Sequence, residues 1–427
     1  MSEAPSGVAT PTPEDARGIL ADLVRDAGRD VLATLARWTG NLALAEDAVQ
    51  DASVRALQTW PRDGIPDNPV AWLRTTARRC AVDLIRREVA RGPKEALAVD
   101  SGTLGDDTVL PDEDPEPAVV EDDLLRLVLT CCHPSLAADT RVALALRTLC
   151  GLSTEDVARA LLVSEATMAK RLTRARQKIR VAGIPYRVPS ADELPERWDT
   201  VLATTYLMFN EGYAATAGPH LMRPALVAEA IRLTRLLRRL RPGDAGAAGL
   251  LALMLLQDSR RDSRVDETGA AVLLADQDRS AWDAVSIAEA VPLVGEGLRL
   301  SPGHPDSYVV QAALAACHAL APSWEDTDWA AIVSWYDVLL TLDDGPVVRL
   351  NRAAAVAEWQ GAEVGLALVD GIDGLAGYPL WHATRGVLLR RLGREEEAAR
   401  ADATATALPL NAVQRRLLER DAPGSQT

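Results

Sequence analysis

The stretch that decides the fold runs Gly151-Leu-Ser-Thr-Glu-Asp-Val-Ala-Arg-Ala-Leu-Leu-Val-Ser-Glu-Ala-Thr-Met-Ala-Lys-Arg-Leu-Thr-Arg-Ala-Arg-Gln-Lys-Ile-Arg180. Ser153 followed by Asp156 is a capping signal for a short first helix, and Ser164 can cap a second one. Two capped helices separated by a tight turn are typical of a helix-turn-helix. The stretch therefore predicts a helical domain built around this motif.

The second of these helices combines an apolar stripe with a basic face. Met168, Leu172, Ala175 and Ile179 recur at helical spacing and are expected to be buried together. No acidic residue occurs between Lys170 and Arg180. A basic helix of this kind suits the polyanionic groove of DNA. The plainer alternative is a surface helix with solvated basic residues. The residues expected to contact DNA are Ser164, Glu165, Thr167, Lys170, Arg171, Arg174, Arg176 and Lys178.

The overall composition predicts an acidic, all-α protein of more than one domain. Its 427 residues and 48% hydrophobic content are enough for several cores. Aromatic residues make up 4%, so the cores must consist mainly of Ala, Leu and Val, which favours helices. A net charge of −15 argues against a protein that simply coats nucleic acid. With no apolar run of membrane-spanning length and no signal peptide, we expect a cytoplasmic protein without membrane contact.

The sequence offers no catalytic, metal or cofactor site. The five cysteines lack disulfide or zinc-ribbon spacing. On a helix, the adjacent side chains of Cys131-Cys132-His133 would point about 100° apart and converge poorly on one ion. No Gly-rich phosphate loop or nucleophile motif occurs, and the five histidines show no metal-ligand spacing. We therefore expect no enzyme, no cofactor and no metal, with the cysteines serving as small apolar core residues.

The N-terminal part is predicted to form a first helical domain over residues 17–91, after a disordered tract over residues 1–16. The run from Ala45 to Leu57 places small apolar side chains inward and Glu46, Asp47, Gln50 and Asp51 outward. Pro61 and the Gly and Pro residues after it are expected to break the helix. The next helix, from Val70 to about Arg91, buries an apolar stripe and exposes a row of arginines. The stripe comprises Leu73, Ala77, Cys80, Ala81 and Leu84.

Three further regions follow along the chain. Residues 92–121 contain several prolines among acids that continue through Asp123, and they predict a flexible acidic linker. Residues 122–184 form the second helical domain, which ends in the helix-turn-helix. Residues 185–427 are helical again, and a phrase of Glu-Ala, an apolar helix and Leu before Pro recurs from Glu229, Glu289 and Glu397. This phrase favours a tetratricopeptide-like repeat domain, and chance similarity among Ala-rich helices is the alternative.

The order of these segments resembles that of bacterial sigma factors of the extracytoplasmic-function group. The resemblance rests on Ala45–Asp51, Trp72–Arg87 and the helix-turn-helix, arranged around an acidic linker. The remaining half, with Tyr206–Tyr213 and Asp276–Trp282, looks like the subgroup that carries a C-terminal tetratricopeptide-like domain. The resemblance implies an alternative sigma factor that brings core RNA polymerase to specific promoter DNA. It also implies a C-terminal domain that docks on the sigma domains or on polymerase and regulates transcription in cis.

The resemblance also assigns roles to particular residues. The helix-turn-helix would read the minus-thirty-five element, and Glu46, Asp47, Gln50 and Asp51 would bind polymerase. The residues implied at the minus-ten element are Asp67, Asn68 and Trp72 near an unstacked base and Arg78, Arg79, Arg86 and Arg87 on phosphates. The alternative for Trp72 is that it is a core residue. The alternative for the acidic face of the Ala45–Leu57 helix is that it is merely solvated. The family turn commonly carries Gly where Leu162 stands, which leaves the promoter sequence open.

A different class of function also fits part of this pattern. A helix-turn-helix regulator that binds an operator, with a helical-repeat sensor domain, would need neither the Ala45–Asp51 segment nor the Trp72–Arg87 segment. These two segments therefore favour the sigma factor.

Overall fold

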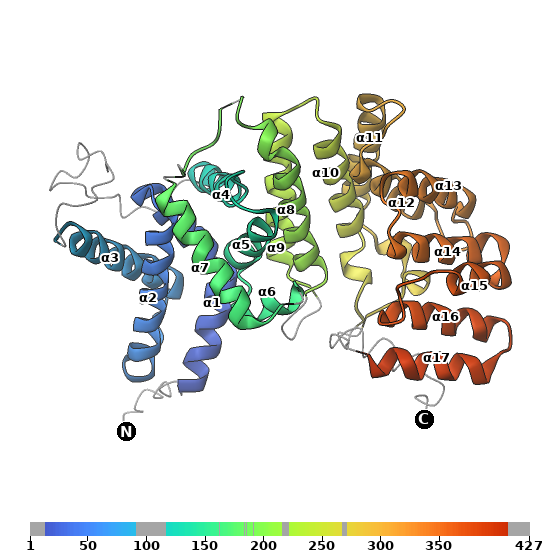
Figure 1. The fold of residues 1–427 in the computed structure, drawn as a ribbon, viewed down its shortest axis with the longest axis horizontal. Coiled ribbons are helices and arrows are strands. Elements are labelled where there is room, and N and C mark those ends of the chain that lie inside the picture. The colour runs from blue at the N-terminus through green and yellow to red at the C-terminus, as the bar shows by residue number, and fades with distance from the viewer. Residues whose placement is uncertain are drawn as a thin grey trace, which may run out of the picture. The chain divides into compact units, whose positions relative to one another are not determined.

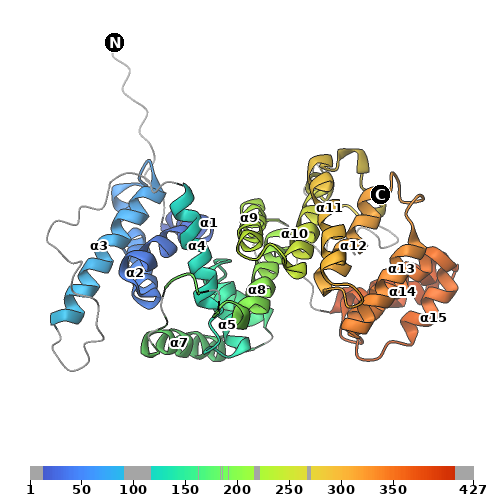
Figure 2. The ribbon, with the colours of Figure 1, turned by 90° about the horizontal axis from the view of Figure 1, so that it is seen from above.

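The computed structural model describes residues 13–90, 117–161, 163–182, 184, 186–190, 192–215, 222–266 and 271–408. Within these ranges the regular structure is helical, apart from one isolated bridge between Val265 and Ala271. The prediction of an all-α protein is confirmed. The chain forms two compact units, Met1–Met208 and Phe209–Thr427 (Figures 1 and 2). None of the described helices is long and apolar enough to span a membrane.

The first unit begins with a three-helix bundle followed by four shorter helices. Small side chains on the second helix allow the helices to approach closely, since Ala45, Ala48, Ala52 and Ala56 have no exposed surface. On the third helix Leu73, Ala77, Cys80 and Ala81 are buried as expected, and Leu84 is half-buried. The helices are α1 (Pro13–Thr39), α2 (Leu42–Asp63), α3 (Pro69–Ala90), α4 (Pro117–Cys131), α5 (Ala138–Thr148), α6 (Thr154–Ala160) and α7 (Glu165–Val181).

Two helices start earlier than the sequence analysis expected. Helix α1 begins at Pro13, inside the tract expected to be disordered, and α4 begins at Pro117, inside the expected linker. Proline suits the first position of a helix because the N–H that it lacks has no partner there. Residues 1–12 and 91–116, which include the remainder of both predicted segments, lie outside the described residues.

Helix α2 continues through Pro61, where the sequence analysis expected it to break. The helix runs on to Asp63, and Pro61 lies in its last turn. The neighbouring Trp60 is 1% exposed and anchors this turn in the core. Gly64, with φ of 86°, donates its N–H to the carbonyl of Trp60 at 3.0 Å and ends the helix. The turn is thus held by packing and a glycine cap at the point where proline removes one hydrogen bond.

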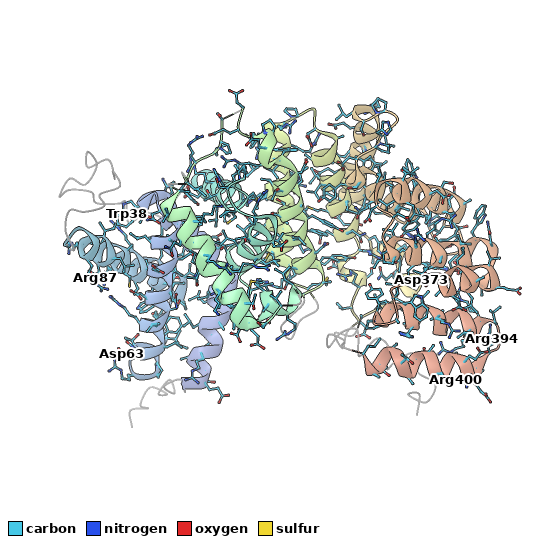
Figure 3. The ribbon with its side chains drawn as sticks, in the orientation of Figure 1. Trp38, Asp63, Arg87, Asp373, Arg394 and Arg400 are labelled. Atoms are coloured by element: carbon cyan, nitrogen blue, oxygen red, sulfur yellow. The ribbon has the colours of Figure 1, made fainter. Side chains whose placement is uncertain are left out.

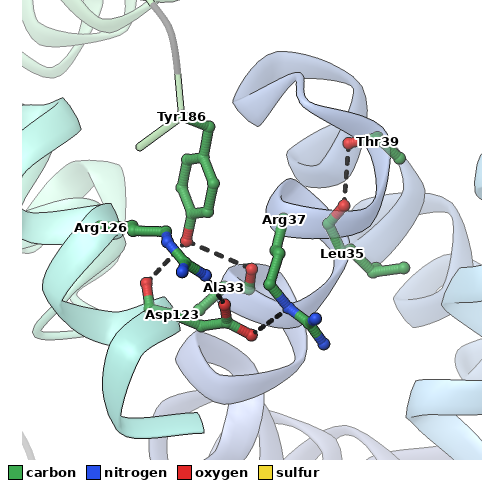
Figure 4. A network of polar contacts seen from close by, with 7 residues as sticks. All are labelled: Ala33, Leu35, Arg37, Thr39, Asp123, Arg126 and Tyr186. Atoms are coloured by element: carbon green, nitrogen blue, oxygen red, sulfur yellow. Dashed lines mark hydrogen bonds and ion pairs between the residues drawn. The ribbon is translucent and has the colours of Figure 1, made fainter. Parts of the chain in front are cut away.

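A buried carboxylate joins α1 to α4 (Figure 4). The side chain of Asp123 has no exposed surface and accepts hydrogen bonds from Arg37 Nε and Arg126 Nη1, each at 2.8 Å. The hydroxyl of Tyr186 lies 2.8 Å from the backbone oxygen of Asp123 and 3.2 Å from that of Ala33. Burial raises the pKa of Asp123, and the two arginines act in the opposite direction. One buried residue therefore connects α1, α4 and the segment after α7.

The first half of α8 (Pro195–Tyr213) belongs to the first unit. Cys132 donates its thiol hydrogen to the Thr204 hydroxyl at 3.2 Å, and Arg141 donates to the Thr200 hydroxyl at 2.7 Å. Before α8, the Nη1 and Nη2 nitrogens of Arg187 each donate to the Glu193 carboxylate at 2.9 Å. These hydrogen bonds lower the pKa of Glu193 to about 2. The compact unit consequently extends to Met208, beyond the residue 184 expected from the sequence.

In the second unit each helix packs against the next along the chain. Figure 1 shows α13 to α17 stacked in successive layers, and the tetratricopeptide-like repeat stays a prediction. The helices are α9 (Pro224–Leu240), α10 (Ala245–Asp258), α11 (Ala284–Leu300), α12 (Ser307–Leu320), α13 (Trp329–Leu342), α14 (Pro346–Gln360), α15 (Ala362–Asp370), α16 (Pro379–Arg391) and α17 (Glu395–Ala407), with short 3-10 turns at Arg261–Ser263, Leu274–Asp276 and Arg279–Ala281.

Close helix crossings in this unit depend on glycine. A Cβ at Gly249 of α10 would lie 2.5 Å from the backbone nitrogen of Val309 in α12. A Cβ at Gly386 of α16 would lie 2.3 Å from a carboxylate oxygen of Asp402 in α17. Helices α16 and α17 thus cross closely at Gly386, and Gly393, with φ of 72°, forms the turn between them.

The Asp276–Trp282 segment caps the end of α12. The guanidinium of Arg279 donates to the carbonyls of His318 and Ala321 at 2.9 and 3.0 Å, and to the Thr327 hydroxyl at 3.1 Å. Terminal carbonyls of a helix lack partners within the helix, so this arginine satisfies them. Burial lowers the pKa of the adjacent His318 to about 4. The segment therefore has a structural role within its own unit.

The Tyr206–Tyr213 segment is likewise accounted for by packing. Phe209 is 1% exposed, and its ring stacks on Tyr213 with the centroids 5.5 Å apart. The guanidinium of Arg264 covers the Tyr213 ring at 3.5 Å. A Cβ at Gly212 would lie 2.8 Å from the backbone nitrogen of Val227, so only glycine permits this approach of α9.

Replacing Asp123 by Ala is expected to loosen the contact between α1 and α4. Loss of the charged acceptor removes two hydrogen bonds, which contribute about 1–3 kcal/mol because both arginines retain some contact with water. Hydrogen–deuterium exchange in the full chain should become about 5–150-fold faster in α1 and α4. The control is Asp199→Ala, which removes an exposed carboxylate from α8. Equal exchange in both variants would show that Asp123 does not hold the helices together.

Candidate nucleic-acid interface

The helix-turn-helix forms as the sequence predicted. The Ser153 hydroxyl accepts a hydrogen bond from the backbone N–H of Asp156 at 3.0 Å and caps α6. The Ser164 hydroxyl accepts one from the N–H of Thr167 at 3.3 Å at the start of α7. Helix α6 packs directly on α7. Leu162, in the turn between them, lies outside the described residues.

The apolar stripe of α7 faces the core of the first unit. Met168, Leu172, Ala175 and Ile179 are each at most 4% exposed. The predicted burial of this stripe is confirmed. It fixes the rotation of α7, so the residues on the opposite side must face outward.

The outward side of α7 carries the first group of predicted DNA-contacting residues. Ser164, Glu165 and Thr167 are exposed around the first turn, and Lys170, Arg174 and Lys178 are exposed farther along the helix. Arg171 is partly covered, with its guanidinium 3.8 Å from the Asp139 carboxylate. The structure therefore gathers seven of the eight predicted residues on or beside one surface.

A cleft beside this surface was not foreseen from the sequence. It has a volume of about 350 Å³ and lies between the start of α5 and the basic side of α7. No side chain caps the first turn of α5 at Ala137, so N–H groups of a helix N-terminus lie next to three cations. That combination attracts anions such as a DNA phosphate. The lining residues are Leu136, Ala137, Asp139, Thr140, Arg171, Arg174, Ala175 and Lys178.

Arg176 is placed differently from the other predicted residues of α7. Its Nε lies 2.5 Å from Oε2 of Glu46 on α2, and the arginine side chain is 32% exposed. Arg176 is thus engaged within the protein and is not part of the outward basic surface. Its contact with DNA stays a prediction.

The residues predicted at the minus-ten element gather on α3 and at its start. Asp67 and Asn68 are exposed, and the Asn68 side chain caps α3 by accepting the N–H of Ala71 at 3.0 Å. Trp72 is partly exposed and meets the buried Trp60 edge to face, with centroids 5.4 Å apart. The indole therefore serves the core while keeping one side accessible. Both sequence-based interpretations of Trp72 are compatible with this placement.

The predicted arginines of α3 lie outside the buried core. Arg78 is half-buried, whereas Arg79, Arg86 and Arg87 are exposed. Figure 3 labels Arg87 on the last turns of α3. Exposed arginines that follow one another along a helix suit contacts to a phosphate backbone.

The acidic residues of α2 do not form one uniform exposed face. Asp47 and Gln50 are exposed and Asp51 is half-buried, but the Glu46 side chain is only 10% exposed. Burial raises the pKa of Glu46, while the ion pair with Arg176 acts to lower it. The Thr148 hydroxyl donates to Glu46 at 3.4 Å. The expectation that Glu46 lies on the outer surface is therefore not met in this structure.

No cluster of metal-binding side chains is evident in the part of the chain that the structure describes. There, no three His, Cys, Asp or Glu side chains are grouped closely enough to hold an ion. The five cysteines are free thiols, four of them buried. Burial raises the pKa of Cys132 to about 11, which disfavours the reactive thiolate. The cysteines act as small core residues.

Together, a capped helix-turn-helix with an exposed basic face and an arginine-bearing three-helix bundle define a DNA-binding transcription protein. Residues 23–91 match sigma-70 region 2, and residues 126–179 match sigma-70 region 4. Residues 197–297 match a family described only as being of unknown function. The chain therefore carries sigma-70 regions 2 and 4 of the extracytoplasmic-function type, followed by a larger C-terminal helical unit.

Two relatives accompany these matches. An uncharacterized protein of Rhizobium meliloti is 45% identical over 386 residues, which cover 89% of this chain and 90% of that protein. The extracytoplasmic-function RNA polymerase sigma factor SigE of Mycolicibacterium smegmatis is 30% identical over 160 residues, covering 37% of this chain and 59% of SigE. No solved structure is significantly similar. Sigma-70 domains imply binding to core RNA polymerase and promoter DNA.

Replacing Arg174 by Ala is expected to weaken promoter binding through loss of a phosphate contact. Arg174 is exposed and lines the cleft at the start of α5. A phosphate contact should lower affinity similarly for all sequences and reduce the salt slope by about 1. The measurement is a fluorescence-anisotropy titration at several salt concentrations.

The matched control for this experiment is Arg159→Ala on α6. Arg159 is also exposed, but Glu155 and Asp156 already pair with it at 3.0 and 3.2 Å. The control should bind like the unmodified chain. An unchanged salt slope for Arg174→Ala would remove α7 from the DNA interface.

Proposed function

We propose that this sigma factor reads the minus-thirty-five element of its promoters with α7 and the minus-ten element with α3. The observation that carries the proposal is the exposed, acid-free basic face of α7 beside the open N-terminus of α5. Residues of the first turn, Ser164, Glu165 and Thr167, would contact base edges. Lys170, Arg171, Arg174 and Lys178 would hold phosphates and fix the register on the duplex.

Opening of the minus-ten element is proposed to take place at the start of α3. A base leaving the duplex loses its stacking, which costs a few kcal/mol, so the protein must offer new contacts. The accessible side of Trp72 offers an aromatic surface, and Asp67 and Asn68 lie exposed a turn away. Arg78, Arg79, Arg86 and Arg87 would hold the phosphates of the strand along α3.

The contact with core polymerase is proposed to be the acidic side of α2. Asp47 and Gln50 are exposed and Asp51 is half-buried there, whereas Glu46 would have to be released from Arg176 before it could take part. Like charges on one exposed helix face favour a basic partner surface and speed its encounter.

Run-off transcription with purified core polymerase tests this function directly. The full chain should direct synthesis from a promoter that core enzyme alone ignores. Asp47→Arg should reduce the transcript at least tenfold, because it places a positive charge on the polymerase-binding side. Asp199→Arg makes the same charge change on α8 and should transcribe normally. Equal amounts of transcript from Asp47→Arg and Asp199→Arg would exclude this face of α2 as the docking surface.

We also propose that the C-terminal unit regulates transcription in cis, by docking on the sigma domains or on polymerase. It is covalently joined to the first unit through α8, and a domain tethered so closely has an effective concentration in the millimolar range. A weak contact would then be largely occupied. The unit also has cores of its own, such as the cluster around Leu350, Val369 and Leu389.

Truncation after Met208 tests regulation in cis. This end point keeps the α8 residues that contact Cys132 and Arg141, which a truncation near Ile184 would remove. The truncated chain is expected to lose promoter-dependent transcription, because the C-terminal unit would no longer contact its target. Circular dichroism and promoter binding report whether the first unit remains folded. A folded truncated chain that transcribes like the full chain would contradict regulation in cis.

A further inference from the structure

A cavity of about 400 Å³ in the first unit has no role in the function proposed above. Its walls come from α1 and α2, from the end of α5 and from one residue of α7. Pockets that bind small organic molecules commonly have volumes of about 300–1,000 Å³ and combine apolar walls with a few polar groups. The lining of this cavity has the same combination and therefore fits a small organic ligand.

One end of the cavity is apolar. Helices α1 and α2 are joined by a short turn and pack along their lengths, so they run antiparallel and the start of α1 meets the end of α2. There Leu20 is 5% exposed and packs with Ala56 and Trp60. Val24 and Leu57 continue the same wall. Because Leu57 is 41% exposed, this end of the cavity is open to solvent.

Toward the other end the lining is rich in guanidinium groups. Arg29, Arg147 and Arg176 line the cavity there, and Glu46 supplies a carboxylate. That carboxylate already serves Arg176, with its Oε2 2.5 Å from Nε, and it accepts the Thr148 hydroxyl at 3.4 Å. The two guanidinium groups of Arg29 and Arg147 therefore share little of its charge.

Arg29 lines the cavity without a complete set of hydrogen bonds. Its side chain is 8% exposed, and among the residues that the structure describes its Nε has no hydrogen-bond acceptor. The Asp30 carboxylate lies 3.6 Å from this nitrogen, which is too far for a hydrogen bond. A buried guanidinium is costly unless acceptors surround it. An anion in the cavity would supply such an acceptor.

The charge of Arg147 is likewise incompletely compensated. Its Nη1 donates to the Leu152 carbonyl, an uncharged acceptor, at 2.7 Å. Burial lowers the pKa of Arg147, the nearby charge of Arg176 lowers it further, and Glu46 acts in the opposite direction. With Arg17, the described lining carries four arginines and one acidic residue. The electrostatics of the cavity therefore favour an anionic ligand.

We propose that this cavity binds a small organic acid, with the apolar body against Leu20, Val24 and Leu57 and the carboxylate held by Arg29 and Arg147. The class of ligand follows from the two ends. An apolar chain gains free energy by leaving water at the first end, and a carboxylate forms charge-assisted hydrogen bonds at the second. An uncharged or cationic molecule of the same length lacks the second gain. The site gives the unit that carries the sigma-70 regions a ligand of its own, separate from promoter DNA and polymerase.

Displacement of a dye from the full chain tests this site, with octanoate as the probe. The dye is anilinonaphthalene sulfonate, an apolar ring system with one anionic group, whose fluorescence reports whether it is bound. Octanoate should displace it. Octanol and octylamine share the apolar chain but lack the negative charge, so they should displace the dye about tenfold more weakly.

Two pairs of variants locate the site. Arg29→Gln removes the buried charge and should weaken octanoate binding about tenfold. Its control is Arg159→Gln on α6, an exposed arginine outside the cavity, which should leave binding unchanged. Val49→Phe fills part of the cavity without removing a charge and should also weaken binding about tenfold. The same enlargement at Val285 of α11, which is 78% exposed, should have no effect.

Hydrogen–deuterium exchange locates bound octanoate without any substitution. At saturating octanoate, exchange in α1 and α2 should slow about threefold, because bound ligand stabilises the helices that hold it. Exchange in α14 to α17 should stay the same. This measurement serves where Arg29→Gln or Val49→Phe fails to fold.

Three results would overturn the proposal. The first is millimolar octanoate that neither displaces the dye nor slows exchange in α1 and α2. The second is equal displacement by octanol or octylamine, and the third is equal weakening of binding in Arg159→Gln or Val285→Phe. Because polymerase and promoter are absent from these experiments, their outcome is independent of the proposed function.

Discussion

The first unit depends on neutralising one buried carboxylate. Asp123 has no exposed side-chain surface, so its charge is tolerable only with hydrogen bonds from cations close by. Arg126 comes from the same helix, but Arg37 comes from α1, so region 4 can bury Asp123 fully only by packing on region 2. The chain therefore brings two DNA-binding regions together through a local electrostatic requirement.

The placement of α7 follows from this packing. Once α4 is fixed on α1, the buried stripe from Met168 to Ile179 turns the basic residues of α7 outward and Arg176 toward α2. Arg176, which meets Glu46, is thus turned away from the outward basic face. The same geometry places α7 and α2, the helices proposed to contact DNA and polymerase, against each other.

Features set by local sequence were predictable. The Ser153 cap, the stripe of α7 and the alanines of α2 depend on spacing within one helix, and all are present. Asp123 was different, because in sequence it ends a run of acids and looks solvated. Its burial depends on Arg37, 86 positions away, and no local pattern encodes such a pairing. The Glu46–Arg176 contact escaped prediction for the same reason, and Pro61 was misjudged because the anchoring by Trp60 is tertiary.

The C-terminal unit shows why a motif can be recognised before its role is understood. Arg279 and Gly212 belong to the two segments noted in the sequence. In the structure Arg279 caps α12, and Gly212 permits the close approach of α9.

The most direct test of the account is an experimental structure of the full chain bound to core RNA polymerase and promoter DNA. The account predicts that α3 lies at the minus-ten element and α7 at the minus-thirty-five element, with the acidic side of α2 against polymerase. A promoter complex in which α3 or α7 lies away from its element would contradict it.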